Sequence, residues 1–473
     1  MDKFTKWMIL ATISTGAFMA SLDGSIVNIT LPTLVKTFDT NFTDTKWIVL
    51  VYYLIVTSFI LPFGRLGDVI GRKKIYLTGF VIFTIGSLLC GLSNSLLSLT
   101  ISRAIQGLGG AMLMSLGFAI ITSLFGPKER GKALGIVATS VSIAIITGPV
   151  LGGLILEYFS WRFIFYINIP VGIFGVYMII KYIEPDKVKN SNMFNIKSAV
   201  SLFSFMISLL MGISSAGKTG LSIATIILFS VFIASLILLI IFELKAKNPI
   251  MDFGMFKNHT FTIGLVSGIS VFISLSGVLV LLPFYLENIL GFKSGKAGML
   301  ISIIPLFMGI SSPIAGVMAD KLGSNKITIA GIIMLLAGFI AVSGISTNTT
   351  VTEFLTRLVL IGTGMGFFMT PNNNAIMGSV PKNRLGVSSG MLALSRTLGQ
   401  ALGVAILGAL WTRKTDIFLS TVTADKLTAK MLALQSTFSI VIIIITLILI
   451  INIYAFIRNR KLVITEEYNL GSE

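Results

Sequence analysis

The sequence contains almost no cysteine and almost no histidine, with one residue of each among 473. A disulfide needs two cysteines, and thiolate or imidazole metal sites need several such ligands. Cys90 lies within an apolar stretch, and His259 has no second histidine with which to share a metal. No cluster of a nucleophile with its base is found either. We therefore expect no disulfide framework, no metal site, no cofactor and no enzyme activity.

Charged residues are also scarce, at 12% against 54% hydrophobic residues, and the mean hydropathy is +0.94. A soluble globular domain has about a quarter of its residues charged, so this composition excludes one and predicts a polytopic membrane protein. The formal net charge of +17 suggests nucleic acid at first sight. The basic residues follow the apolar runs, however, so we predict that they orient the chain and attract anionic lipid, with no nucleic-acid partner.

Long apolar runs dominate the chain. Fourteen runs of roughly 20 residues are each long enough to cross a bilayer. They begin near residues 8, 47, 75, 97, 133, 163, 198, 220, 261, 297, 327, 354, 386 and 433. The first run lacks a small-residue cleavage site and is predicted to be an uncleaved helix. The polar segments between the runs are too short for a soluble domain, which disfavours a membrane sensor.

The distribution of Lys and Arg predicts the orientation of the chain. With the N-terminus in the cytoplasm, the inside segments hold roughly 23 of these residues and the outside segments roughly 10. The remaining three, Arg103, Arg357 and Arg396, fall within apolar runs. We therefore predict a protein of the cell membrane with both termini in the cytoplasm.

Two sequence blocks recur at nearly one spacing. GRLGDVIGRKK (64–74) returns as GVMADKLGSNK (316–326), and FGPKERGKALG (125–135) returns as SVPKNRLGVSSG (379–390). Both repeats lie roughly 250 residues apart, which is typical of transporter halves related by an axis along the membrane normal.

The repeats predict an all-α membrane protein with fourteen transmembrane helices in three parts. Two pseudo-symmetric six-helix bundles occupy residues 1–184 and 246–473, the latter with a cytoplasmic tail, and an inserted pair of helices occupies 185–245. The stretch GISSAGKT (212–219) matches a phosphate-binding loop by chance, because no strand precedes it and it ends a predicted span. The sequence therefore gives no support to ATP-driven transport.

The loop after the second span combines glycines with a carboxylate and basic residues. Gly64 and Gly71 allow a tight turn and close helix approach, and Asp68 can accept hydrogen bonds from an arginine such as Arg72. The pattern resembles the signature loop of the major facilitator superfamily, which implies the major facilitator fold and a latch between conformations. The second copy keeps Asp320 but replaces Arg72 by Ser324, so the same role is less clearly expected there.

Two charges lie at similar depth within apolar runs. RAIQGLGGAML (103–113) resembles the family motif in which an intramembrane arginine takes part in proton transfer. Asp23 and Arg103 both fall in the outer half of the bilayer at 1.5 Å per residue. A buried arginine without a partner is costly, so we expect the two to pair. The pair is either a protonation switch or a permanent ion pair that only fixes packing.

The fifth span carries glycines around a proline, in the order Gly148, Pro149, Gly152 and Gly153. Glycines let a neighbouring helix approach closely, and proline bends the helix axis. The stretch resembles the signature of exporters in this superfamily, with Ala144 where glycine is usual. A tight, dry seal at this helix is expected to hinder proton leak.

Further stretches narrow the resemblance. LDGSIVNITLP (22–32) and WRFIFYINIPVG (161–172) resemble motifs of the fourteen-span drug:proton antiporters. Glu287, near the outer end of the ninth span, is either a second proton-carrying acid in the cavity or a solvated charge at the rim. MTPNNNAIMG (369–378) places asparagines within a span, where polar groups face a cavity or another helix. The residues predicted to line the substrate cavity are Asp23, Asn28, Glu287, Asn372 and Asn373.

The resemblance implies a proton-coupled exporter of amphipathic, cationic drugs that works by alternating access, with Asp23, Arg103 and Glu287 in proton coupling. Its expected partners are protons, membrane lipids and the drug, and the expected state is a monomer. Two alternatives stay open. The first is an exporter of a lipid, a metabolite, a metal–drug complex or a monovalent cation, and the second is a nutrient symporter of the same fold. Arg396 is predicted to be buried, with a partner that the sequence does not name.

Overall fold

The computed structural model describes residues 3–184, 195–246, 250–251, 253–381, 384–422 and 424–470. Every regular element in these ranges is a helix, and fourteen helical segments among them are long and apolar enough to cross a membrane. Helices are favoured here because a bilayer offers no water to the backbone, so each N–H and C=O must bond within its own segment. The predicted all-α architecture with fourteen spans is confirmed.

The helices fall into a first half, a connecting pair and a second half. The first half contains α1 (Lys3–Thr37), α2 (Phe42–Thr45), α3 (Trp47–Ile70), α4 (Arg72–Leu92), α5 (Leu96–Leu124), α6 (Pro127–Tyr158), α7 (Phe163–Tyr166) and α8 (Asn168–Tyr182). The connecting pair is α9 (Ile196–Thr219) and α10 (Ile223–Lys245). The second half contains η1 (Phe253–Lys257), α11 (His259–Phe284), η2 (Tyr285–Ile289), α12 (Ser294–Ile301), α13 (Ile303–Leu322), α14 (Ser324–Ser343), α15 (Val351–Gly378), α16 (Leu385–Thr421) and α17 (Lys426–Leu470).

The two halves repeat local structure as well as sequence. Gly71 and Gly323 end α3 and α13 with φ of 103° and 91°, a conformation that residues with a Cβ rarely adopt. Ser95 and Thr350 begin α5 and α15, and each forms a reciprocal capping box with the residue three positions on. The same turn and the same cap therefore recur at equivalent places, as the repeated blocks predict.

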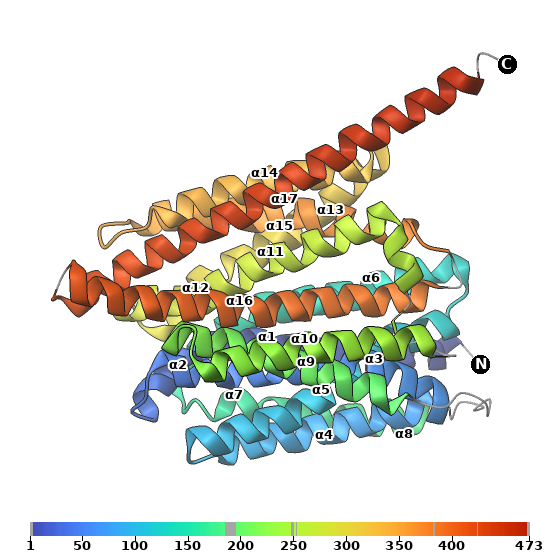
Figure 1. Cartoon of the computed structure of the whole chain (residues 1–473). Helices are drawn as coiled ribbons and strands as arrows, with labels where there is room; N and C mark the ends of the chain where they lie inside the picture. The colour runs from blue at the N-terminus through green and yellow to red at the C-terminus, as the bar shows by residue number, and fades with distance from the viewer. Residues whose placement is uncertain are drawn as a thin grey trace.

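The helices of the two halves also pair in the same way. In the first half α4 packs on α5, α1 on α6 and α3 on α5, and in the second half α14 packs on α15, α11 on α16 and α13 on α15. The halves meet where α6 packs on α12 and where α3 packs on α16, with α1 against α11 between them. Figure 1 shows the long helices of both halves with their axes roughly aligned, and α17 slanting away from the others towards its C-terminal end.

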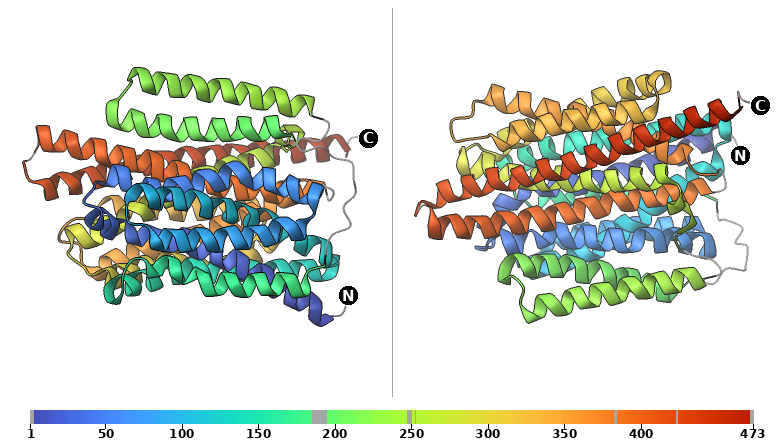
Figure 2. Two further views of the ribbon diagram at one scale, coloured as in Figure 1. Left: turned by 90° about the horizontal axis from the view of Figure 1, so that it is seen from below. Right: turned by 45° about the horizontal axis from the view of Figure 1, so that its top comes forward.

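The connecting pair lies at the edge of the bundle (Figure 2). α9 packs on α10 and also touches α3 and α16, so it contacts both halves. α10 exposes isoleucines such as Ile226, Ile227 and Ile233, each more than half exposed. The position agrees with an inserted pair whose outer helix faces lipid, while the boundaries at residues 184 and 245 stay a prediction.

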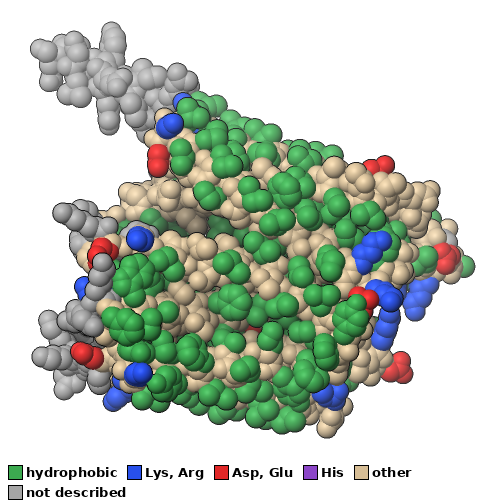
Figure 3. Space-filling view, turned by 180° about the vertical axis from the view of Figure 1, so that it is seen from behind, with side chains coloured by type: hydrophobic (Ala, Val, Ile, Leu, Met, Phe, Trp, Pro, Cys, Tyr) green, Lys and Arg blue, Asp and Glu red, His purple; other side chains and the backbone are tan. Residues whose placement is uncertain are grey.

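The bundle has two ends, which we name by what they carry. The termini face carries the start of α1, the end of α17 and the turn at Gly71, and the far face carries α2, α7 and the start of α12 (Figure 1). Figure 3 shows hydrophobic side chains over the middle of one side, with Lys, Arg, Asp and Glu gathered towards the two ends. A belt of this kind matches the hydrocarbon core of a bilayer between two wet surfaces.

Candidate functional site: a buried ion pair beside a central cavity

Asp23 on α1 and Arg103 on α5 form a direct ion pair. Nη1 of Arg103 lies 2.5 Å from Oδ2 of Asp23, and the two side chains are 1% and 0% exposed. The predicted pairing is therefore present in the structure. A fully buried pair is costly to desolvate, and it is tolerated when further hydrogen bonds satisfy the remaining polar atoms of both groups.

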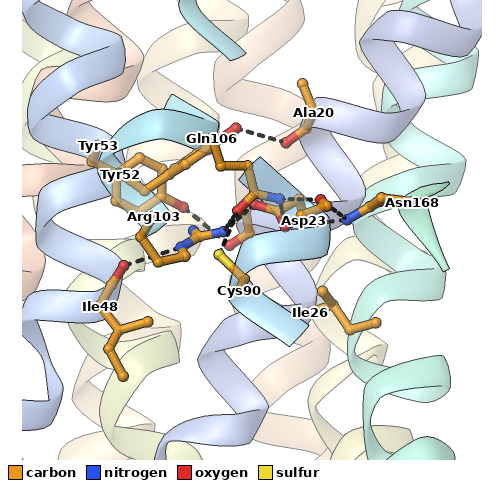
Figure 4. A network of polar contacts seen from close by, with 12 residues as sticks. Ala20, Asp23, Ile26, Ile48, Tyr52, Tyr53, Cys90, Arg103, Gln106 and Asn168 are labelled. Atoms are coloured by element: carbon orange, nitrogen blue, oxygen red, sulfur yellow. Dashed lines mark hydrogen bonds and ion pairs between the residues drawn. The ribbon is translucent and has the colours of Figure 1, made fainter. Parts of the chain in front are cut away.

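Those further bonds come from Gln106 on α5 itself and from two more helices, α4 and α8 (Figure 4). Gln106 Nε2 donates to Asp23 Oδ1 at 2.8 Å and to the Ser87 hydroxyl at 2.6 Å, while Gln106 Oε1 accepts from Arg103 Nη1. Asn168 Nδ2 lies 3.4 Å from Asp23 Oδ1 and 3.1 Å from the Ser87 hydroxyl. The network therefore ties α1, α4, α5 and α8 together at one point.

Arg103 extends the network to α3. Its Nε donates to the Ile48 carbonyl oxygen at 3.2 Å, and its guanidinium carbon lies 4.3 Å from the centre of the Tyr52 ring. A cation over an aromatic face is attracted by the ring quadrupole. The Tyr52 hydroxyl lies 3.4 Å from the Ala20 carbonyl oxygen, back on α1. A change in the charge of Asp23 would therefore be felt at α3 through Arg103.

A central cavity lies between the two halves and holds about 1010 Å³ of empty space, part of it open to solvent. It is lined from the first half by residues that include Asn28, Tyr52 and Tyr53, and from the second half by residues that include Phe272 and Arg396. Four methionines complete much of the apolar lining: Met114, Met308, Met365 and Met369. The lining is mostly apolar with a few polar side chains, as ligand-binding clefts are, and methionine adapts to varied shapes.

Of the five residues predicted to line this cavity, Asn28 does so. Asp23 does not line it: the neighbouring Ala20, Gly24 and Tyr52 do, with the carboxylate sealed behind them. Helix geometry explains the difference, because residues one position apart point in directions about 100° apart, so Gly24 faces the cavity and Asp23 faces α5.

The other three predicted residues lie elsewhere. Glu287 sits in the π-helical turn η2 at the far face, half-buried, outside the cavity lining, and with no hydrogen bond to its Oε1 among the described residues. Asn372 donates to the Gly264 carbonyl oxygen at 3.2 Å and lines a small separate pocket near the termini face. Asn373 lines neither space. Position on a helix is readable from sequence, but the direction a side chain faces depends on how the helix is rotated in the bundle.

The glycines of α6 allow close contact with both halves. A Cβ added at Gly148 would lie 2.6 Å from the Ser25 hydroxyl, and one at Gly152 would lie 2.6 Å from Ile29, so this stretch packs tightly on α1. A Cβ on Gly153 would collide with the Ser294 carbonyl oxygen, at the start of α12. Pro149 lines the cavity, and its carbonyl oxygen meets Gly298 of α12.

Aromatic side chains close the same end of the molecule. Phe42 stacks edge-on against Phe284 and Trp411, with ring centres 5.1 and 5.0 Å apart, and so joins α2 to α11 and α16. The hydroxyls of Thr43 and Thr412 lie 3.3 Å apart beside this cluster. Together with the α6–α12 contact, these residues hold the two halves together at the far face.

The predicted latch loop is also assembled. Arg72 donates from Nη2 and Nε to Asp68 Oδ1 at 2.9 and 3.2 Å, and from Nη1 to the Ala119 carbonyl oxygen of α5 at 3.1 Å. Gly71 supplies the turn that brings these groups together, and Gly64 lies against Ser115 of α5. In the second half, Asp320 has no ion pair within the described ranges, since Ser324 stands where Arg72 does.

Sequence reasoning missed the network partners of the ion pair and the place of Arg396. Gln106 and Asn168 both stand within stretches that were recognised as motifs, Gln106 three residues after Arg103 on one helix face. An amide at that spacing was therefore a usable signal. Ser87 and Tyr52 carried no such signal, because their role depends on how separate helices pack.

A buried carboxylate–guanidinium pair beside a central cavity, between two repeated halves made of membrane-spanning helices, is the architecture of a membrane transporter. The family model of the Major Facilitator Superfamily matches residues 13–404. The chain therefore belongs to the Major Facilitator Superfamily, with fourteen spans.

Comparisons with named proteins agree with this family. The chain is 37% identical to the riboflavin transporter RibZ of Clostridioides difficile (strain 630), covering 85% of this chain and 87% of that protein. It is 30% identical to multidrug resistance protein 3 of Bacillus subtilis (strain 168), covering 88% and 80%. Among solved structures, a bacterial homolog of the human lysosomal transporter Spinster in an inward-facing conformation has a TM-score of 0.65 at 15% identity, covering 96% and 98%. The last likeness shows the fold alone.

Proposed function

We propose that this chain is a secondary active exporter that exchanges protons for amphipathic small molecules by alternating access between its two halves. The observation that carries the proposal is the sealed Asp23–Arg103 pair, which lies directly behind the cavity wall formed by Gly24 and Tyr52. We further propose that both termini are cytoplasmic and that the membrane is the cell membrane, as the distribution of basic residues predicts.

Proton binding to Asp23 is the proposed switch. A proton on the carboxylate removes its attraction for Arg103, whose guanidinium also holds the Ile48 carbonyl oxygen and stacks on Tyr52. Because a buried arginine needs compensation, the loss of that attraction favours a different packing of α1, α3 and α5. Tyr52 lines the cavity, so the repacking changes the surface that contacts the substrate.

The contacts between the two halves at the far face support alternating access. With the termini in the cytoplasm, the contacts of α6 with α12 and the aromatic cluster at Phe42 close the cavity to the outside. Opening this seal while the termini face closes would expose the cavity, and the region of Asp23, to external protons. The tight α6 contact supports a seal against proton leak, in line with the exporter motif.

The driving force depends on the charge of the substrate. One entering proton supplies about 2.3 kcal/mol per 100 mV, and one exported monovalent cation opposes the same amount. With Asp23 as the single proton site, export of a cation is driven by the pH gradient alone. Export of a neutral or anionic compound is driven by the membrane potential as well. Glu287 lies outside the cavity lining and gives no support to a second proton site there.

The expectation of cationic drugs depended on a carboxylate in the cavity, and the described lining holds none. Multidrug resistance proteins among the relatives support amphipathic drugs as substrates. A second candidate is riboflavin, because one relative is named as a riboflavin transporter. The aromatic rings of Tyr52, Tyr53 and Phe272 together with amides such as Asn28 suit a planar compound with polar edges.

Everted membrane vesicles with an imposed acid interior test the exchange directly. Adding a substrate to the outside, which corresponds to the cytoplasm, is expected to dissipate the pH gradient only in vesicles that contain the protein. Ethidium, riboflavin and a neutral amphipathic drug are compared at equal concentration. A gradient that no compound dissipates, while labelled compound still crosses the membrane, would contradict proton antiport and favour a uniporter.

The latch loop gives a prediction of its own. We expect Asp68→Asn to slow the initial rate of transport, because Arg72 loses the carboxylate that orients it towards the Ala119 carbonyl oxygen. Stability should fall by less than about 1 kcal/mol, since both side chains are partly exposed. Asp320→Asn is the matched control in the second half, where no arginine pairs with the carboxylate in the described ranges. Equal slowing in both variants would contradict a latch specific to Asp68.

A further inference from the structure

Arg396 of α16 lies in the lining of the central cavity, with Thr397 and Gln400 beside it on the same helix. Every described residue that lines this cavity is uncharged apart from Arg396. Its side chain is half-buried and lies between the two halves, opposite residues of α1 and α3 such as Asn28 and Tyr53. The cavity therefore carries one positive charge and no negative charge on its described walls.

Arg396 has no counter-ion in the part of the chain that the structure describes, and no hydrogen bond or aromatic stacking partner there either. Arg103, the other arginine close to the cavity, differs because Asp23 neutralises it. An arginine in a low-dielectric site needs acceptors for its five N–H donors. The geometry of the guanidinium suits a planar group that offers two oxygen atoms side by side.

A second polar side chain at the cavity, Asn28, also has an atom without a hydrogen-bond partner among the described residues. This atom is Oδ1, which is buried. The Gln400 side chain forms no hydrogen bond there either, although its backbone carbonyl accepts from Ser276. Buried polar groups without partners are uncommon in folded proteins unless a ligand or water completes them. The unused groups come from both halves, as expected for a site that a substrate bridges.

We propose that Arg396 is a specificity-determining residue that binds the oxygen acceptors of a planar aromatic substrate, so that the cavity prefers organic anions and carbonyl-rich neutral compounds to organic cations. The proposal rests on the transport function proposed above and names the substrate class of the same cavity. Tyr52, Tyr53 and Phe272 contact the rings, and the four methionines of the lining accommodate apolar substituents. A cationic substrate would meet the unpaired charge of Arg396 and would find no carboxylate on the described walls to offset it.

Two xanthene dyes of opposite charge test the preference. Fluorescein and rhodamine 123 share a three-ring skeleton, but fluorescein carries a carboxylate and is anionic at pH 7.5, whereas rhodamine 123 is an esterified cation. Binding to the purified full-length protein in nanodiscs is measured by fluorescence anisotropy, with no gradient present. We expect fluorescein to bind at least about tenfold more tightly than rhodamine 123, since a hydrogen bond to a charged group has roughly this value.

The variants assign the preference to Arg396. Arg396→Gln is expected to weaken fluorescein binding by about 10- to 100-fold, the range for a charge-assisted hydrogen bond, and to remove the preference over rhodamine 123. Arg396→Lys keeps the positive charge without the planar guanidinium group, so we expect it to retain part of the preference for fluorescein over rhodamine 123. Arg413→Gln removes the same charge from an exposed position on α16 and is expected to change nothing.

Three outcomes would overturn the inference: tighter binding of rhodamine 123 than of fluorescein, no saturable fluorescein binding, or equal fluorescein affinity in Arg396→Gln and Arg413→Gln. If Arg396→Gln does not fold, Arg396→Lys is compared with Arg413→Gln in its place, and equal fluorescein affinity in these two variants would also overturn the inference. The binding assay needs no gradient and is therefore independent of the vesicle assay. If fluorescein binds more tightly than rhodamine 123 but no compound dissipates the pH gradient in vesicles, the proposed antiport is wrong and this inference stands. If rhodamine 123 dissipates the pH gradient in vesicles and fluorescein does not, the proposed antiport stands and this inference is wrong.

Discussion

We expect the Asp23→Asn variant to lose proton-driven export and to behave in the everted-vesicle assay like membranes without the protein. Asparagine has the shape of aspartate but cannot bind and release a proton in the way a carboxyl group does. It also leaves Arg103 without the negative charge that lies 2.5 Å away in the native protein. Removing one partner of a buried ion pair costs about 3 to 5 kcal/mol, so we also expect a lower thermal stability.

Folding and coupling can be separated in this experiment. Cys90 is fully buried next to the network, with Sγ 3.7 Å from Gln106 Oε1, and it is the single cysteine of the chain. Its reaction with a thiol-specific dye on heating therefore reports unfolding of this region. A variant whose Cys90 stays protected at the assay temperature, and which still fails to dissipate the pH gradient, has lost coupling and not its fold.

A double variant separates a proton switch from a permanent ion pair that only fixes packing. Asp23→Asn combined with Arg103→Gln removes both charges, so no uncompensated charge is left buried, which is the main cost when one partner of a buried pair is removed. We expect this protein to fold and to stay uncoupled. Recovery of proton-driven export in the double variant would show that the pair acts only in packing, and unaltered export by Asp23→Asn alone would have the same meaning.

The second large effect is expected at Gly153, where α6 meets α12. We expect Gly153→Val to open the far face, because the added side chain collides with the Ser294 carbonyl oxygen. Overpacking of this kind costs about 1 to 3 kcal/mol, which corresponds to a shift of about 5- to 150-fold away from the closed state. Transport should fall, since a carrier that cannot close one side cannot complete its cycle.

Disulfide formation between Thr43→Cys and Thr412→Cys measures the closed state, because the two hydroxyls lie 3.3 Å apart across the halves. We expect the disulfide to form about 5- to 150-fold more slowly when Gly153→Val is added. Gly135→Val is the control on the same helix, where an added Cβ has nothing within 4 Å. If both glycine variants cross-link at the native rate, the α6–α12 contact does not control closure of the far face.

Much of the architecture was predictable because the bilayer restricts the possible structures. Apolar runs of the right length have to be helices in lipid, so the number and order of the spans followed from composition alone. The repeated blocks predicted repeated local structure, and the positive φ of Gly71 and Gly323 bears this out. The pairing of Asp23 with Arg103 was also predictable, since two opposite charges at one depth have few other partners in an apolar surrounding.

The lining of the cavity was less predictable. Asp23, Glu287, Asn372 and Asn373 were expected in it because polar residues within spans usually face the interior. The structure instead places Asp23 in an ion pair, Glu287 at the far face and Asn372 in a small separate pocket, while Asn373 lines neither space. Arg396 was predicted to be buried; it is half-buried and lines the cavity, a place that depends on where α16 stands relative to α1 and α3.

The sequence by itself determined the class of this protein, a membrane transporter with fourteen spanning helices, and it predicted the repeated blocks, the glycines of α6 and the pairing of Asp23 with Arg103. These features depend on neighbouring residues in the chain or on depth in the membrane, and depth follows from the number of residues between a position and the end of its span. Only the tertiary structure decided that Asp23 is sealed behind Tyr52 while Arg396 faces the cavity. The reason is rotational, because a helix turns about 100° per residue and its packing against other helices selects which face meets the open space.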